Sequence, residues 1–106
     1  MTGPGTTDQR ESGHAATAGT VRVQYWAAAR SAAGVGHDDV PVHGDVSLAE
    51  LREAALARRG DDDRLRRVLD VCSVLVGDRP AGAGDPAEVL VRPGEQVQFL
   101  PPFAGG

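Results

Sequence analysis

Leucine, valine, phenylalanine, tyrosine and tryptophan are absent from the first twenty positions of the chain and recur after them. The opening segment consists of Gly, Thr, Ser, Ala and isolated charges, which cannot bury enough apolar area to offset the cost of ordering the chain. We therefore expect a disordered tail over residues 1–19 and a folded domain over residues 20–100. Residues 101–106 form a separate extended arm in this interpretation.

Alternating apolar and polar positions predict the first strand over residues 21–26. Its apolar face ends in Tyr25, which leaves Trp26 on the polar face. A second strand is predicted over residues 39–42. It contains Pro41, which cannot donate a hydrogen bond to a neighbouring strand and therefore suggests a sheet edge.

Three helices are predicted from local signals. An alanine-rich segment favours a short helix that ends at the glycines of residues 34–36. Ser47 and Glu50 match a capping box at the start of a second helix, which stops at Gly60. The three aspartates of residues 61–63 fit the start of a third helix. We prefer this interpretation to a metal site, because three adjacent aspartates cannot all point at one ion.

Three further β segments follow. Residues 71–76 form an apolar run broken only by Ser73, and residues 89–91 form a shorter run. Residues 96–100 alternate again and place Leu100 on the outward face. The capped helix is then the main cover of one sheet face. These elements predict an α+β domain whose other sheet face meets water or a partner.

Composition narrows the class of protein. A chain of 106 residues forms one small domain, and its apolar stretches fall far short of the ~20 residues that span a bilayer. The first 20 residues lack the apolar core of a secretory signal, so we expect a cytoplasmic protein. The net charge of -4 argues against nucleic acid as a partner. One cysteine excludes a disulfide framework.

Candidate catalytic groups have simpler explanations. His14 lies in the tail, and an extended strand would hold His37 and His43 about 20 Å apart, so we expect no zinc site. Cys72 shares a face with Val74, and we interpret it as a small buried hydrophobic residue rather than a nucleophile. The paired glycines do not continue into phosphate-binding loops. We therefore expect this chain to bind no metal and no cofactor.

The C-terminal arm carries the strongest signal in the sequence. Its two prolines fix an extended conformation, and its two glycines have no Cβ to obstruct a narrow channel. Six residues reach at most about 20 Å. In the alternative interpretation, these are small terminal residues that have no fixed structure and no function. The arm follows directly from Leu100 and reads Pro101, Pro102, Phe103, Ala104, Gly105 and Gly106.

The segment VRPGEQVQFLPPFAGG, residues 91–106, resembles the C-terminus of the MoaD/ThiS family of ubiquitin-like sulfur carriers, most of all its molybdopterin synthase branch. VRVQYWAAARSAAGV resembles the first strand and short helix of that family, and SLAELREAAL its capped helix. The resemblance implies a ubiquitin-like β-grasp fold, in which a mixed sheet has helices on one face. The first and last strands then lie side by side at the sheet centre. The longer segment over residues 79–88 departs from the family pattern.

The resemblance also implies a mechanism. An E1-like, MoeB-like adenylating enzyme would use ATP to convert the carboxylate of Gly106 into an acyl adenylate and then a thiocarboxylate. A large, MoaE-like subunit would receive the arm in a heterotetramer and use the sulfur to build the dithiolene of molybdopterin. Catalytic groups would sit on that subunit, so the chain by itself would not be an enzyme.

Two alternatives remain open at this point. The same chemistry could serve thiamine, cysteine or another thiolated product, or the chain could be a ubiquitin-like protein modifier. All 11 basic residues are arginine, so chains of the protein cannot be built on its own side chains. If the terminal strands are neighbours, Trp26 and Leu100 lie near the root of the arm and form a partner patch with Phe103. In the competing interpretation, Trp26 is tucked under the alanine-rich turn.

Overall fold

The structure is a computed structural model that describes residues 18–82 and 84–102. The predicted tail lies outside this range, except for its last two residues. The elements follow in the order β1 Gly19–Tyr25, α1 Ala27–Ala33, β2 His37–Val42, β3 Val46–Ser47, α2 Leu48–Arg58, α3 Asp63–Asp70, β4 Ser73–Val76, β5 Arg79–Pro80, the 3-10 helix η2 Pro86–Glu88, β6 Leu90–Val91 and β7 Gln96–Leu100.

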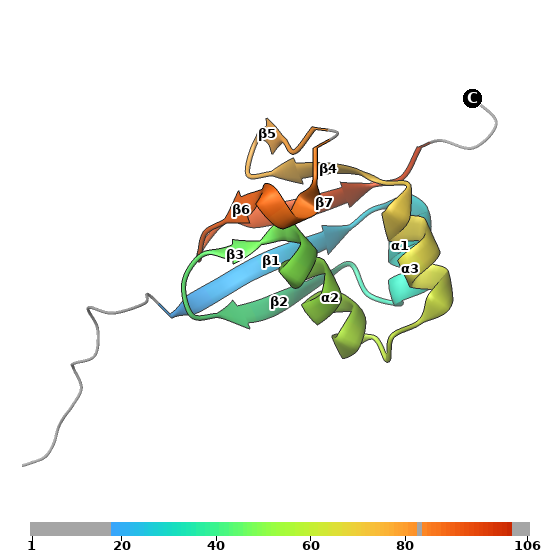
Figure 1. Ribbon diagram of the computed structural model, residues 1–106. Coiled ribbons are helices and arrows are strands. Elements are labelled where there is room, and N and C mark those ends of the chain that lie inside the picture. The colour runs from blue at the N-terminus through green and yellow to red at the C-terminus, as the bar shows by residue number, and fades with distance from the viewer. Residues whose placement is uncertain (1–17, 83, 103–106) are drawn as a thin grey trace, which may run out of the picture.

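Five strands form a mixed sheet in the order β2-β1-β7-β4-β5 (Figure 1). β1 and β7 pair in parallel, and every other pair in this sheet is antiparallel. The predicted central position of the first and last strands is therefore confirmed. β2 lies at an edge, as Pro41 indicated, and β3 pairs with β6 in a separate two-stranded sheet.

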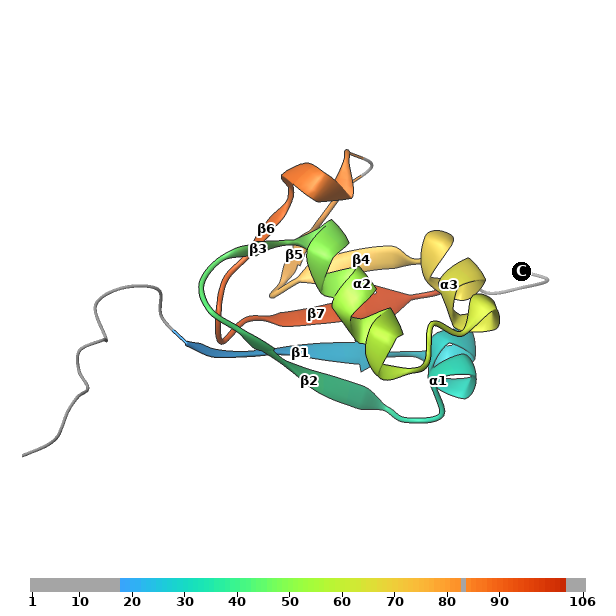
Figure 2. The same ribbon diagram turned by 60° about the horizontal axis from the view of Figure 1, so that its bottom comes forward.

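α2 covers one face of the five-stranded sheet, and the opposite face carries no helix among the described residues (Figure 2). The predicted capping box is present, because the Glu50 amide donates to Ser47 Oγ and the Ser47 amide donates to Glu50 Oε1. The α+β class is thus confirmed. The core between helix and sheet includes Val21, Val23, Tyr25, Leu51, Leu56, Leu65, Val76, Val91, Val97 and Phe99.

α1 and α3 pack together at the end of the sheet where β1 and β7 finish (Figures 1 and 2). α1 ends at Gly34, whose φ of 80° is left-handed. α3 begins at Asp62, whose side chain accepts a hydrogen bond from the Leu65 amide, as expected for a helix-start aspartate. This arrangement puts two helix termini next to the residues that precede the arm.

Several predicted boundaries were wrong. β1 ends at Tyr25 rather than residue 26, β2 begins two residues before 39, and β6 begins at Leu90 rather than residue 89. The third predicted strand begins at Ser73 rather than residue 71, because the Val71 and Cys72 amides donate to carbonyls of the last turn of α3. The two-residue strands β3 and β5 and the helix η2 were not predicted.

A buried carboxylate fastens the end of α2 to the sheet. Asp38 on β2 is only 5% exposed and faces the core beside two buried valines. It accepts a hydrogen bond of 2.9 Å from the Tyr25 hydroxyl and one of 2.8 Å from Arg59 Nη2. Arg58 Nε lies 3.6 Å from the same carboxylate. Burial, together with the bond to Asp38, raises the pKa of Tyr25 above its ordinary value.

Candidate functional site

The last strand is held on both sides up to its final residue. In β7, Phe99 pairs with Tyr25 of β1, and Leu100 pairs with Ser73 of β4. The Trp26 amide donates a hydrogen bond of 3.2 Å to the Phe99 carbonyl. Because two flanking strands fix β7, the chain that leaves it starts from a rigid position.

The arm begins directly at this anchored strand. Pro101 is half-buried and Pro102 is exposed. Neither proline has an amide to continue the sheet, so the pairing of β7 stops at Leu100. The remaining predicted arm residues, Phe103, Ala104, Gly105 and Gly106, lie outside the described residues.

Trp26 lies where β1 gives way to α1. Its side chain is 42% exposed, and its indole Nε1 donates a hydrogen bond of 2.9 Å to Gln98 Oε1. Gln98 and Leu100 share the helix-free side of β7, since Val97 and Phe99 are buried on the other side. The structure therefore places Trp26 and Leu100 at the same end of the sheet. The competing interpretation, burial under the turn, does not match this exposure.

Ala27 holds the turn from β1 into α1 in a strained conformation. Its φ of 49° is left-handed, which costs a residue with a Cβ about 1–2 kcal/mol. The Trp26 carbonyl then accepts hydrogen bonds from the Ala29 and Arg30 amides and starts the helix. Strain of this kind clusters at functional surfaces.

The middle of the helix-free sheet face is polar. Gln24 of β1 pairs with Gln98 of β7, and Arg22 pairs with Gln96. Arg22 Nε donates a hydrogen bond of 2.9 Å to Asp39 Oδ1 on β2. This bond holds the pKa of Asp39 below its ordinary value. Apolar contact with a partner is therefore available at the end of this face rather than at its centre.

A hollow of about 400 Å³ lies on the helix-bearing side of the sheet, lined by Cys72, Val74, Pro80 and Phe99 among other residues. Cys72 Sγ donates a hydrogen bond of 3.2 Å to the Val68 carbonyl. Burial raises the pKa of this thiol to about 11, so the thiol is protonated at neutral pH. Cys72 is only half-buried, so its predicted burial was wrong, although the raised pKa does not favour a nucleophile.

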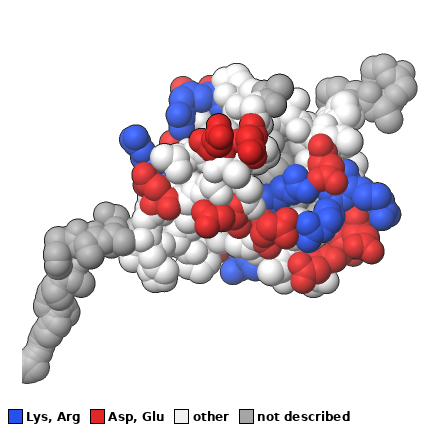
Figure 3. All heavy atoms as spheres, in the orientation of Figure 1, with Lys and Arg blue, Asp and Glu red and all other residues white. Residues whose placement is uncertain are grey.

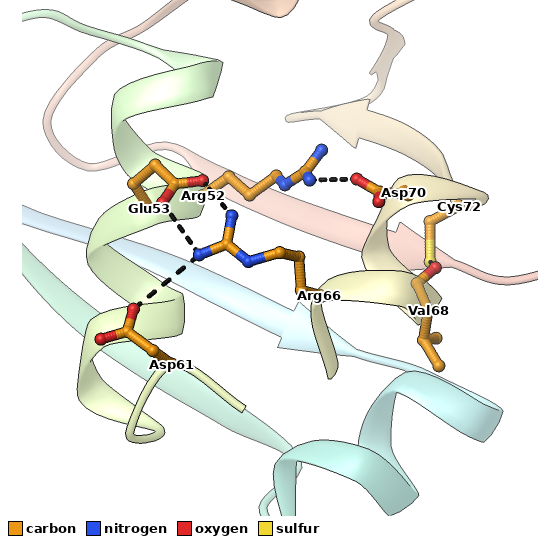
Figure 4. A network of polar contacts seen from close by, with 7 residues as sticks. All are labelled: Arg52, Glu53, Asp61, Arg66, Val68, Asp70 and Cys72. Atoms are coloured by element: carbon orange, nitrogen blue, oxygen red, sulfur yellow. Dashed lines mark hydrogen bonds and ion pairs between the residues drawn. The ribbon is translucent and has the colours of Figure 1, made fainter. Parts of the chain in front are cut away.

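Ion pairs connect the two helices beside this hollow (Figure 4). Arg52 of α2 is paired with Asp70 at the end of α3, and Arg66 Nη1 lies 2.9 Å from Glu53 Oε2. Acidic and basic side chains are interspersed over this face of the molecule (Figure 3). Exposed ion pairs such as Arg66–Glu53 contribute little to stability.

Metal-ligating side chains do not gather in the described part of the chain. His37 is the first residue of β2 rather than lying ahead of the strand, His43 follows the strand's end, and His14 lies outside the described residues. Within residues 18–82 and 84–102, no group of three or more His, Cys, Asp or Glu is placed to hold a metal ion. No helix in these two ranges has the length and apolar character needed to cross a membrane.

No protein-family model and no curated protein matches the sequence. Solved structures do match the fold. Small archaeal modifier protein 1 (SAMP1) from Haloferax volcanii is 23% identical with a TM-score of 0.66, over 83% of this chain and 100% of that one. The chain has a ubiquitin-like β-grasp fold.

Two further structures with a similar fold are described as parts of a molybdopterin-converting factor. A protein from Pyrococcus furiosus, assigned as subunit 1 of a molybdopterin-converting factor, is 19% identical with a TM-score of 0.63, over 80% of this chain and 99% of that one. A complex of subunits 1 and 2 of this factor from Helicobacter pylori gives 22% identity and a TM-score of 0.53, over 82% and 99%. The fold implied by the sequence resemblance is thus confirmed.

Proposed function

We propose that this β-grasp protein is a sulfur carrier that bears a thiocarboxylate on Gly106. The observation that carries the proposal is the central strand β7, which is paired on both sides and leads directly into the Pro-Pro-Phe-Ala-Gly-Gly arm. A rigid root and the restricted backbone of Pro101 and Pro102 lower the entropy lost when a partner takes up the arm. The proposal requires Gly106 to carry the free terminal carboxylate.

The chemistry begins with a poor electrophile. A carboxylate resists attack until one oxygen becomes part of a good leaving group, which adenylation by ATP on an E1-like enzyme supplies. Adenylation releases pyrophosphate. A sulfide-level nucleophile such as hydrosulfide then attacks the acyl carbon, displaces AMP and leaves a thiocarboxylate, whose sulfur is ionised at neutral pH and can attack a substrate. We place this chemistry in the cytoplasm. The protein supplies the reacting carboxylate, and its partners supply the catalytic groups.

Among sulfur-carrier pathways, we propose molybdopterin synthesis, with a MoaE-like subunit as acceptor in a heterotetramer. The PPFAGG ending and the similar fold of a molybdopterin-converting factor subunit found in complex with subunit 2 support this choice. The similar fold of an archaeal modifier protein supports the alternative of a protein modifier. A pull-down separates the pathways, because a thiazole synthase or cysteine synthase-like partner would replace the MoaE-like subunit if the product were different.

Intact mass tests the carrier chemistry. We expect coexpression with the cognate adenylating enzyme and a sulfur donor to shift the mass by one oxygen-to-sulfur exchange, and fragmentation to locate the shift at Gly106. The same spectrum verifies that Gly106 ends the chain. A protein expressed without the enzyme is the control. An unchanged mass under conditions in which the enzyme is active contradicts every carrier version of the proposal.

Trp26 is expected to contribute to docking on both partners. The Trp26→Ala variant lacks an exposed aromatic side chain at the root of the arm. We expect its affinity for the adenylating enzyme and for the acceptor subunit to fall about tenfold or more. Gln24→Ala, on the polar middle of the same face, is the matched control and should bind nearly as the wild type. Circular dichroism should show both variants folded. Unchanged affinities for Trp26→Ala would remove this residue from the interface.

A further inference from the structure

Although 25% of the chain is charged and Asp70 ends α3 nearby, in a pair with Arg52, six residues around the end of β7 carry no charge. They come from the points where β1 and β7 end, β4 begins, α1 begins and α3 stops. We call this surface the collar and define it as Trp26, Ala27, Val71, Ser73, Leu100 and Pro101. Depletion of charge with an aromatic residue present is typical of the core of a protein interface.

Val71 is the unexpected member of the collar. It follows α3 directly and is 61% exposed. Two residues further on, Ser73 pairs with Leu100, so Val71 lies on the β4 side of the end of β7. Trp26 lies on the β1 side, because the sheet order is β1-β7-β4. The two exposed apolar residues therefore lie on opposite sides of the end of β7.

Exposed large hydrophobic side chains are rare elsewhere in the described residues. Besides Trp26 and Val71, only Leu90 belongs to this class within residues 18–82 and 84–102, and it lies in the short β3–β6 sheet. The centre of the helix-free face presents Gln24, Gln98 and neighbouring polar groups, whose burial costs free energy unless a partner pairs with each of them. Apolar docking area is thus concentrated at the collar.

We propose that the partner that takes up the arm also contacts Val71, so that the interface encircles the arm root and extends to the end of α3. This proposal rests on the proposed function, because the occupant is the adenylating enzyme, whose channel receives the arm. Continuity supports that occupant, since the collar surrounds the root of the arm and would lie against the mouth of the channel that receives the arm. Such a partner presents an uncharged, apolar rim around the mouth of its channel.

The test compares two similar exposed residues in the full chain. Val71→Glu places a charge in the collar, whereas Leu90→Glu places one on a side chain of similar exposure, 57%, away from the end of β7 (Figures 1 and 2). The probe is the cognate adenylating enzyme with ATP. We expect Val71→Glu to weaken binding about tenfold or more and Leu90→Glu to bind within about twofold of the wild type. Val71→Ser replaces Val71→Glu if circular dichroism shows the latter to be unfolded.

Sulfur loading of the wild-type protein is measured in parallel, so that the two proposals fail separately. If the wild type acquires sulfur but the folded Val71 variant binds normally, the collar proposal is overturned and the carrier function stands. Equal losses in Val71→Glu and Leu90→Glu also overturn it, since a general charge effect explains them. The wild type could instead self-associate through the collar. If Val71→Glu abolishes that self-association without changing the affinity for the enzyme, the collar binds a second copy of the chain and the proposal is overturned. A wild type that takes no sulfur overturns both proposals.

Discussion

One glycine added after Gly106 is expected to abolish sulfur loading while leaving the domain as stable as before. The addition moves the terminal carboxylate by about 3.5 Å along an extended chain. A shift of even 1 Å in the position of reacting atoms costs about a hundredfold in rate, so we expect a loss of more than about a hundredfold in adenylation. The measurement is the initial rate of thiocarboxylate formation, followed by intact mass.

A protein without residues 1–17 is the control for this extension. It should acquire sulfur at the wild-type rate, because β1 begins only at Gly19 and the root of the arm is unchanged. Both proteins should unfold at the wild-type denaturant concentration. Sulfur loading of the extended protein at the normal rate would rule out the terminal-carboxylate mechanism.

Replacement of Asp38 by alanine is expected to lower the free energy of unfolding by about 3 kcal/mol. The buried Tyr25 hydroxyl and Arg59 would both lose their acceptor. Arg58 and Arg59 are partly exposed and can regain water, which keeps the loss at the lower end of the range for a broken buried pair. For a domain of this size the loss corresponds to a fall in Tm of about 12–24 °C, measurable by circular dichroism.

Asp39→Ala is the matched control, because Asp39 is the next residue of the same strand on the opposite face. Its carboxylate is 46% exposed and pairs with Arg22 at the surface. Exposed pairs of this kind contribute little, so Asp39→Ala should unfold close to the wild-type temperature. Equal losses in the two variants would show that the buried network does not stabilise the fold.

Elements with long, regular signals could be predicted from the sequence. The alternation in β1 and β7 and the capping box of α2 are local patterns, and each corresponds to the observed element. Strands of two residues, such as β3 and β5, are too short to show any period. The residues preceding β4 were mistaken for strand because Val71 and Cys72 extend an apolar run. A helical spacing was also present, since Leu65, Val68, Leu69 and Cys72 follow the period of α3.

The candidate site was predictable only in part. Alternation placed Trp26 and Leu100 each on an outward face, and the neighbouring first and last strands that the resemblance implied brought the two residues together, as the structure has them. Val71 was missed because its position beside β7 depends on pairing between Ser73 and Leu100, which no local pattern encodes. Asp38 was missed for a related reason. Its partners Tyr25 and Arg59 lie on two other elements, so no local pattern connects them with Asp38. The sequence alone showed a charged residue at a position that faces the core.

The parallel pairing of β1 and β7 also determines where a tag or label can be attached without disturbing the arm. Two adjacent parallel strands begin at one end of a sheet and finish at the other, so Gly19 and Leu100 lie at opposite ends of the domain (Figure 1). An affinity tag, fluorophore or surface linker joined ahead of Gly19 therefore leaves the domain far from the root of the arm. Immobilised through that end, the protein would present its collar and arm to solution in a uniform orientation.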